Sequence, residues 1–244
     1  MKVFAHRGAS GDFPENTLVA FEQAIAQQAD GIELDVQYHS GADKWYVIHD
    51  FYVDTTTSGS GLLKAMLPAE LACLRGKDEL PLPTLEQALS AIAGRCPVNI
   101  EIKEREVEQS YIELLVEDLR RRLAVAASTS QYSWSSFILS SFNHSILHAC
   151  KAKLPQVKTG ALIANIPTNL SDCAAELKAS SLNIDLNSLN KVLVDHAHQQ
   201  NIELWVYTVD RPEDVRWCME LGVDAIFSNF PQRSKALIHD HENQ

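Results

Sequence analysis

Short apolar runs alternate with helix-like segments along the chain, and this alternation limits the folds that the sequence can adopt. The apolar runs have the length of buried strands. The segments between them carry apolar residues at helical spacing and helix-capping residues, which are Asn16 or Thr17, the capping-box pair Thr84 and Gln87, and Gly222 at a helix end. Repeated strand-then-helix units with short connections predict a parallel sheet. Eight such units in a chain of 244 residues predict a closed (βα)8 barrel of the TIM type.

Nine runs compete for the eight strand positions of such a barrel. They are residues 3–5, 31–35, 45–48, 98–102, 137–141, 158–163, 182–186, 203–209 and 225–228. The weaker pair, 158–163 and 182–186, is expected to contain one short or peripheral strand. Only residues 36–44 separate the second run from the third, so no helix is expected there. Extended at roughly 3.3 Å per residue, this segment reaches far enough to return beside the barrel.

Residues 51–83 form a connection that is too long for an ordinary loop between a strand and a helix. They contain a polar Thr-Thr-Thr-Ser-Gly-Ser-Gly stretch and a helix-like segment at 68–75. We expect them to form a small cap over the barrel mouth. The chain, residues 1–244, is therefore predicted to be a single barrel domain with a cap insertion at about 51–83 after the third strand.

The composition argues against several classes of partner. Lys and Arg number 21 against 32 Asp and Glu, which gives a net charge of −11. Such a surface repels nucleic acid and anionic membranes, so neither a nucleic-acid partner nor stable membrane association is expected. The N-terminus shows no apolar signal core, no run of 18 apolar residues occurs, and the five cysteines are scattered. These features predict a cytoplasmic protein with reduced cysteines, and they leave the oligomeric state open.

Charged residues gather at the carboxyl ends of the first four apolar runs. They are His6, Arg7, Glu33, Asp35, His49, Glu101 and Lys103. Side chains alternate between the two faces of a strand, so Glu33 and Asp35 point to one side, as do Glu101 and Lys103. The carboxyl ends of the strands build the active site of a TIM barrel. We therefore expect all seven side chains to meet at one mouth.

The charges of this group predict a bound cation. Glu33, Asp35 and Glu101 carry three negative charges, and Arg7 and Lys103 return two positive ones. Burying a carboxylate costs several kcal/mol unless a positive charge meets it. The remaining negative charge leaves room for one divalent cation and one phosphodiester, whose sum is zero. Oxygen ligands alone suit Mg²⁺ or Ca²⁺ better than zinc.

The remaining residues suit phosphodiester chemistry. His6 and His49 can exchange protons near neutral pH, as histidines commonly do. Arg7 can hold a phosphate through two hydrogen bonds, and Lys103 can act on it as a point charge. Together these residues predict a metal-assisted phosphodiesterase. A simpler alternative is that Arg7 and Lys103 only neutralise the carboxylates, without any metal.

An ordered series of motifs resembles the glycerophosphodiester phosphodiesterase family. The series runs through His6-Arg7-Gly8, Pro14-Glu15-Asn16-Thr17, Glu33-Leu34-Asp35-Val36, His49-Asp50, Asn99-Ile100-Glu101-Ile102-Lys103, Ser141-Phe142 and Gly222-Val223-Asp224-Ala225-Ile226. It extends from residue 2 to about residue 231. The resemblance implies a TIM-type barrel of the phospholipase-C-like kind. It also implies hydrolysis of small-molecule glycerophosphodiesters to sn-glycerol 3-phosphate and an alcohol.

The resemblance further implies a division of labour among the residues at the mouth. Glu33, Asp35 and Glu101 would hold one divalent cation, Mg²⁺ or Ca²⁺, and His6 and His49 would act as acid and base. The glycerol 2-hydroxyl would attack phosphorus, and water would then open the resulting cyclic phosphate. Because the attack is intramolecular, it avoids much of the entropic barrier. The sequence leaves open which histidine is the acid and which is the base.

The implied substrate-binding residues are Arg7 and Lys103 for the phosphate, with Tyr207 and Phe142 lining the substrate pocket. Three segments depart from the family's motifs. Thr55-Thr56-Thr57 stands where Arg-Thr-Thr is common, Tyr207-Thr208-Val209-Asp210 stands for Trp-Thr-Val-Asn, and Ser228-Asn229-Phe230-Pro231 stands for Thr-Asp-Xaa-Pro. These departures put substrate preference, including the alcohol head group, in question. They do not touch the metal, histidine or phosphate residues.

Two alternative functions are weighed against hydrolysis of glycerophosphodiesters. One is a related metal phosphodiesterase that acts on intact phospholipid, which the acidic charge and the lack of an apolar cap helix disfavour. The other is a non-catalytic barrel that binds glycerophosphodiesters or a partner protein. Such a barrel would be expected to lack at least one of the two histidines and three carboxylates, and all five are present.

Overall fold

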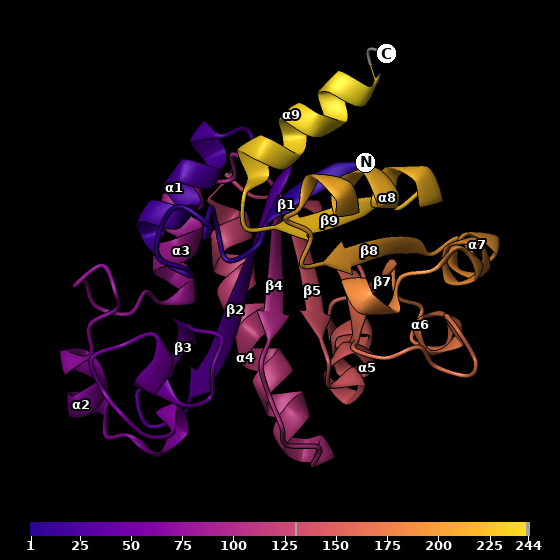
Figure 1. Cartoon of the computed structure of the whole chain (residues 1–244). Coiled ribbons are helices and arrows are strands. Elements are labelled where there is room, and N and C mark those ends of the chain that lie inside the picture. The colour runs from indigo at the N-terminus through magenta and orange to yellow at the C-terminus, as the bar shows by residue number, and fades with distance from the viewer. Residues whose placement is uncertain (130, 243–244) are drawn as a thin grey trace.

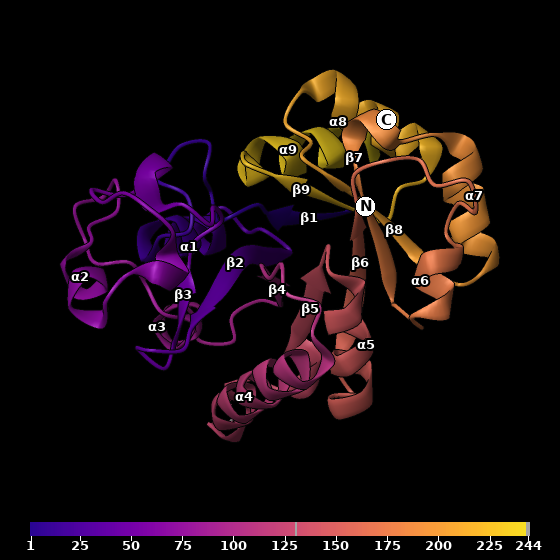
Figure 2. The same cartoon turned by 90° about the horizontal axis from the view of Figure 1, so that it is seen from below.

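Eight parallel strands close into a barrel in the computed structural model, which describes residues 1–129 and 131–242 (Figures 1 and 2). The strands are β1 (Lys2–Ala5), β2 (Gly31–His39), β4 (Val98–Ile102), β5 (Phe137–Ser141), β6 (Lys158–Ile163), β7 (Ser181–Asp185), β8 (Glu203–Tyr207) and β9 (Ala225–Ser228). They follow one another around the barrel in this order, and β1 pairs with both β2 and β9. The predicted (βα)8 barrel is therefore confirmed.

The ninth strand, β3 (Lys44–Val47), lies outside the barrel and corrects the predicted strand assignment. It pairs antiparallel with the far end of β2, from Val36 opposite Val47 to His39 opposite Lys44. Both runs that we expected to supply a peripheral strand, β6 and β7, are barrel strands instead. The absence of a helix between β2 and β3 is confirmed among the described residues, but for another reason. Antiparallel neighbours need only a tight turn, whereas a parallel pair needs a crossover.

Helices cover the outside of the barrel (Figure 2). They are α1 (Leu18–Ala26), α3 (Leu85–Ile92), α4 (Gln109–Ser128), α5 (His144–Lys153), α6 (Asp172–Glu176), α7 (Lys191–Gln199), α8 (Pro212–Leu221) and α9 (Pro231–Glu242), whereas α2 (Pro68–Cys73) belongs to the connection after β3. The predicted caps are present, since Thr17 accepts a hydrogen bond from the Ala20 N–H, and Thr84 forms a capping box with Gln87. No helix within the described residues is long and apolar enough to cross a membrane.

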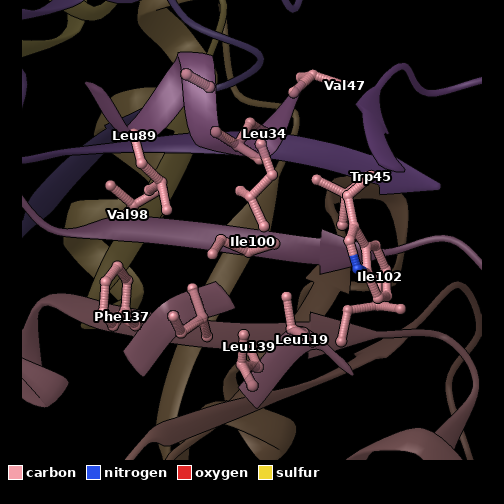
Figure 3. Packing of buried hydrophobic residues seen from close by; sticks show 14 of the residues in the cluster. Leu34, Trp45, Val47, Leu89, Val98, Ile100, Ile102, Leu119, Phe137 and Leu139 are labelled. Carbon is pink, nitrogen blue, oxygen red and sulfur yellow. The ribbon is translucent and has the colours of Figure 1, made fainter. Parts of the chain in front are cut away.

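The alternation of side chains along the strands separates the packed core from the site. Figure 3 shows Val98, Ile100 and Ile102 of β4 between the sheet and its outer helices, where they pack with Leu89 of α3 and Leu119 of α4. The intervening residues of β4 must therefore face the barrel interior. One of these inward-facing residues carries a carboxylate of the predicted metal site.

The long connection at 51–83 has a small apolar core of its own. Val53, Leu63, Leu71 and Leu74 gather there against Tyr46 and Ile48, which belong to the β3 segment. Two short 3₁₀ turns, Val53–Thr55 and Leu63–Ala65, supply the first two of these side chains, and helix α2 with the residue that follows it supplies the other two. The segment therefore packs on the β2–β3 hairpin, to one side of the barrel (Figure 1).

Candidate active site

The carboxyl ends of three barrel strands and one hairpin bring the predicted residues to the same mouth. His6 and Arg7 follow β1, Glu33 and Asp35 belong to β2, and Glu101 belongs to β4 with Lys103 directly after it. We predicted that His49 would follow a barrel strand, and this is wrong because β3 is antiparallel to β2. The hairpin leaves the mouth and returns to it, and the Ile48 N–H donates to the Asp35 carbonyl at 3.0 Å. His49 therefore reaches the mouth from outside the barrel.

Three carboxylates form a compact group at this mouth. One oxygen from each of Glu33, Asp35 and Glu101 lies within 4.8 Å of the other two. The strand register explains the grouping, because Asp35 of β2 lies opposite Glu101 of β4 and Glu33 is two residues earlier on the same face. Glu33 and Asp35 are buried, and Glu101 is partly buried. The three carboxylates thus lie close enough together for one oxygen of each to reach a common cation.

Burial and mutual repulsion act on these carboxylates unequally. Burial, together with the charges of Asp35 and Glu101, raises the pKa of Glu33 well above its usual range. Burial and the charge of Asp35 raise the pKa of Glu101 to about 7. Burial also opposes the charge on Asp35, but the Lys103 ammonium and the Arg7 guanidinium outweigh it and hold the pKa of that carboxyl below its usual range. In the absence of a further positive charge, Glu33 and Glu101 therefore tend to take up protons, and a bound cation would favour their ionised forms.

The contacts of Arg7 and Lys103 test whether these cations alone neutralise the group. Lys103 Nζ lies 2.7 Å from Glu101 and 3.6 Å from Asp35, and Arg7 Nε lies 3.3 Å from Asp35. Within the described part of the chain, the buried Oε1 of Glu33 and Oδ1 of Asp35 still accept no hydrogen bond. Two carboxylate oxygens that accept no hydrogen bond, beside a third carboxylate, fit a hard divalent cation such as Mg²⁺ or Ca²⁺.

The metal-free protein should become less stable as the pH rises through the titration of this group. Glu101 titrates at about 7 in the fold but at about 4.3 in an unfolded chain, so between these values the folded state binds more protons and loses stability with rising pH. Glu33 acts in the same direction, whereas His6, whose pKa is lowered, opposes it below about pH 6.5. Melting temperatures in EDTA should therefore fall more steeply between about pH 5 and 7 for wild type than for Glu101→Gln. Equal slopes for the two proteins would contradict this account of the group.

Each of the two histidines has its Nδ1 held by a neighbouring oxygen. His6 Nδ1 lies 2.8 Å from Asn229 Oδ1, and His49 Nδ1 lies 2.7 Å from Asp50 Oδ1. Burial and the adjacent Arg7 charge lower the pKa of His6 to about 4. Burial opposes the charge on Asp50, but the hydrogen bond with His49 outweighs it and holds the pKa of that carboxyl below its usual range. Both histidines thus have Nε2 available for proton transfer.

A cavity of about 120 Å³ opens at the mouth between the two histidines. It is lined by His6, Arg7, Glu33, His49, Asn99, Glu101, Ser140, Phe142, Leu162, Tyr207, Thr208 and Phe227. The ring of Phe142 meets that of Tyr207 edge-on, with centroids 6.0 Å apart. The Tyr207 hydroxyl donates to the Ile163 carbonyl at 2.7 Å, which fixes the ring on the cavity wall. Of the predicted residues, Asp35 and Lys103 lie outside this lining.

The turn after β1 depends on a glycine. Arg7 and Gly8 both have positive φ, 56° and 82°, and the Arg7 N–H donates to Glu33 Oε2 at 2.9 Å. A Cβ at position 8 would lie 2.7 Å from the backbone of Ala20 in helix α1. The turn that aims His6 and Arg7 at the carboxylates therefore has no room for a side chain at this position.

Gly8→Ala should destabilise the protein by about 1–3 kcal/mol and lower its activity, because the turn must shift away from α1. Gly222→Ala is the matched control, since Gly222 also has φ 82° but a Cβ there would meet nothing within 4 Å. Gly222→Ala should lose only the stability that a non-glycine residue loses at positive φ, without any steric clash. Equal losses of melting temperature in the two variants would exclude the contact with Ala20 as the cause.

Sequence analysis did not assign several side chains that support the site. Asn16, with φ 57°, donates from Nδ2 to Asp35 Oδ2 at 2.9 Å and accepts from the Asp35 N–H at 3.3 Å. Glu15 pairs with Arg7 at 3.0 Å. The Pro-Glu-Asn-Thr motif was a signal for both residues, although we considered Asn16 only as a helix cap. Asp210 and Asn229, which lie behind His6, were noticed only as departures from a pattern.

Comparison with known proteins places this site in a family. Residues 6–233 match the model of the Glycerophosphoryl diester phosphodiesterase family. The chain is 34% identical over 247 residues to the uncharacterised protein YqiK of Bacillus subtilis, with 97% of this chain and 98% of that protein covered. It is 33% identical over 238 residues to a glycerophosphodiester phosphodiesterase of Caldanaerobacter subterraneus, with 94% of each covered.

A solved structure shares the fold along nearly the whole chain. A phosphodiesterase of Oleispira antarctica, in complex with the product sn-glycerol-3-phosphate, superposes with a TM-score of 0.86 at 25% sequence identity. The match covers 98% of this chain and 97% of the other. This chain therefore shares its barrel fold with a phosphodiesterase that was solved in complex with its product.

Proposed function

The chain belongs to the glycerophosphoryl diester phosphodiesterase family, and we propose that it hydrolyses glycerophosphodiesters to sn-glycerol 3-phosphate and an alcohol with the help of one bound divalent cation. One observation carries this proposal. Two histidines, two acidic ligands and an arginine line a single cavity of about 120 Å³, and the third carboxylate and the lysine lie directly beside them. The product seen in the Oleispira antarctica phosphodiesterase is consistent with the same substrate class.

We assign Glu33, Asp35 and Glu101 as the residues that hold Mg²⁺ or Ca²⁺. The chemistry that a bound divalent cation supplies is polarisation of a non-bridging phosphate oxygen and compensation of its charge. Arg7 and Lys103 already contact these carboxylates, so they can add hydrogen bonds to the same phosphate with little rearrangement. Tyr207 and Phe142 form the apolar wall on which the glycerol carbons rest.

In the first step, the glycerol 2-hydroxyl attacks phosphorus. His6 is neutral at pH 7 because its pKa is lowered to about 4, so its Nε2 can take the hydroxyl proton. The new O–P bond forms as the bond from phosphorus to the alcohol oxygen breaks. His49, whose Nδ1 is held by Asp50, gives a proton from Nε2 to the departing alcohol. The product of this step is a five-membered cyclic phosphate.

In the second step, water opens the cyclic phosphate and the histidines exchange roles. His49 now accepts a proton from the attacking water, and His6 returns its proton to the 2-oxygen as the bond from that oxygen to phosphorus breaks. The protein returns to its starting protonation state with sn-glycerol 3-phosphate bound. The two reaction steps, in which the acid and the base exchange roles, require two proton carriers that line the same cavity.

Phosphorus NMR of glycerophosphocholine with the Mg²⁺-loaded protein tests the proposed reaction. Signals of glycerol 3-phosphate should replace those of the substrate, and phosphocholine should not appear. Phosphocholine would mean that the other ester bond breaks, which contradicts the roles assigned above. Turnover of detergent-dispersed phosphatidylcholine in preference to glycerophosphocholine would instead support the phospholipid alternative.

A further inference from the structure

A row of polar side chains leads from the loop after β8 to His6. Asp210 Oδ2 accepts a hydrogen bond from Asn229 Nδ2 at 2.7 Å, and Asp210 Oδ1 accepts from the Asn229 backbone N–H at 2.8 Å. At the other end of the same amide, Asn229 Oδ1 lies 2.8 Å from His6 Nδ1. All three side chains are partly buried, so water competes only weakly for these contacts.

The contact with Asp210 fixes the direction of the Asn229 amide. A carboxylate can only accept, so the side-chain atom of Asn229 that lies 2.7 Å from Asp210 Oδ2 must be the amide nitrogen and not the amide oxygen. The amide oxygen must therefore face His6, and this oxygen can only accept. The hydrogen between Asn229 and His6 must then belong to Nδ1 of the histidine.

We propose that Asp210 is a positioning residue that acts through Asn229 to hold neutral His6 with its proton on Nδ1 and its lone pair on Nε2. The catalytic consequence rests on the proposed function, because only this tautomer leaves Nε2 free to take the proton of the substrate hydroxyl. An imidazole with its proton on Nε2 would turn a donor toward the substrate and could not act as the base.

The two histidines of the site achieve the same orientation by different means. At His49 a carboxylate, Asp50, meets Nδ1 directly at 2.7 Å. At His6 the carboxylate of Asp210 does not touch the imidazole. It orients the neutral amide of Asn229, and the amide oxygen then accepts the hydrogen bond from Nδ1. Asp210 and Asn229 are also two positions at which the chain departs from the motifs that it resembles. Exchanging their side chains would keep one carboxylate and one amide in contact.

Asp210→Asn tests the relay without a change in side-chain size. The Asn229 amide then faces another amide and can turn, so that its NH₂ group donates to His6 Nδ1 and favours the tautomer with the proton on Nε2. Nitrogen-15 NMR of the imidazoles in the Mg²⁺-loaded protein, near neutral pH, distinguishes the tautomers, and a His6→Gln spectrum identifies the His6 signals. We expect the proton on Nδ1 in wild type, a shift toward Nε2 in Asp210→Asn, and a loss in kcat on the order of 10- to 100-fold with KM nearly unchanged.

Two further variants separate positioning from a merely structural role. The double variant Asp210→Asn/Asn229→Asp places an acceptor against His6 Nδ1 again, so it should restore the wild-type tautomer and most of the lost kcat. Ser228→Ala removes the Ser228 hydroxyl, which donates to Asp210 at 3.1 Å, but leaves the Asn229 amide held. It should leave the tautomer unchanged even if the melting temperature falls.

The outcomes distinguish this inference from the proposed function. A proton on Nε2 in wild type, or on Nδ1 in Asp210→Asn, would overturn the positioning role of Asp210 whatever the activity. The expected tautomers in a protein that releases no glycerol 3-phosphate would support the positioning role and overturn the proposed function. A shifted tautomer with unchanged kcat would support the relay and remove His6 as the base.

Discussion

Replacement of either His6 or His49 by alanine is expected to lower kcat by about 10²–10⁴-fold, because each histidine carries a proton in both halves of the proposed reaction. Substrate should still bind, since neither imidazole belongs to the proposed phosphate-binding pair. KM is therefore expected to change little. Initial rates of glycerol 3-phosphate release over a range of glycerophosphocholine concentrations separate these two effects.

The control for both variants is His148→Ala. His148 is exposed on the outer helix α5, so its loss should change neither kcat nor the melting temperature. The double variant His6→Ala/His49→Ala should lose little more than the more damaged single variant, because residues that act as a unit are not additive. Turnover at the wild-type rate in either single variant would remove that histidine from the mechanism.

The second large effect is expected at the metal ligands. Glu33→Gln and Asp35→Asn should each raise the Mg²⁺ concentration needed for half-maximal activity by at least about 10- to 100-fold, since even partners of ligands have effects of this size. In EDTA near neutral pH, Glu33→Gln should melt at a higher temperature than wild type, because the buried Glu33 carboxyl must take up a proton on folding and a neutral amide need not. The same substitution is therefore expected to harm the metal-loaded protein and to stabilise the metal-free one.

Glu104→Gln is the matched control for the ligand variants. Glu104 is a buried carboxylate close to the site. Its side chain pairs with Lys64 and accepts a hydrogen bond from Tyr111, and it does not belong to the group of three proposed metal ligands. Its loss should leave the metal requirement unchanged. An unaltered Mg²⁺ titration in both Glu33→Gln and Asp35→Asn would show that these residues do not bind the ion.

Sequence patterns were sufficient for the barrel because the signals that define it are local. The capping box at Thr84 and the end of α8 at Gly222 are each set within a few residues, and both are found as predicted. The strand β3 was misassigned because periodicity reveals a strand but not its partner. Whether residues 45–48 continue the barrel or fold back on β2 depends on a pairing that no local residue determines.

The site residues that could be predicted to meet are the charged residues that lie on strands. Glu33 and Glu101 meet because β2 and β4 are parallel neighbours in register, and this follows once the fold is known. Asn16 and Asn229 could not be assigned in the same way, because they lie on loops and reach Asp35 and His6 across 19 and 223 residues of sequence. Polar loop residues have no periodicity, so only the folded chain reveals which charged group they contact.

The most direct test of the central claim is glycerol 3-phosphate release from glycerophosphocholine and glycerophosphoethanolamine by the metal-stripped protein. The release is measured with Mg²⁺, with Ca²⁺ and with EDTA, after a melting curve has shown that the stripped protein is folded. We expect release with at least one of the two ions and none in EDTA. Equal release in EDTA would contradict the metal-assisted mechanism, and no release under any condition would contradict the proposed reaction itself.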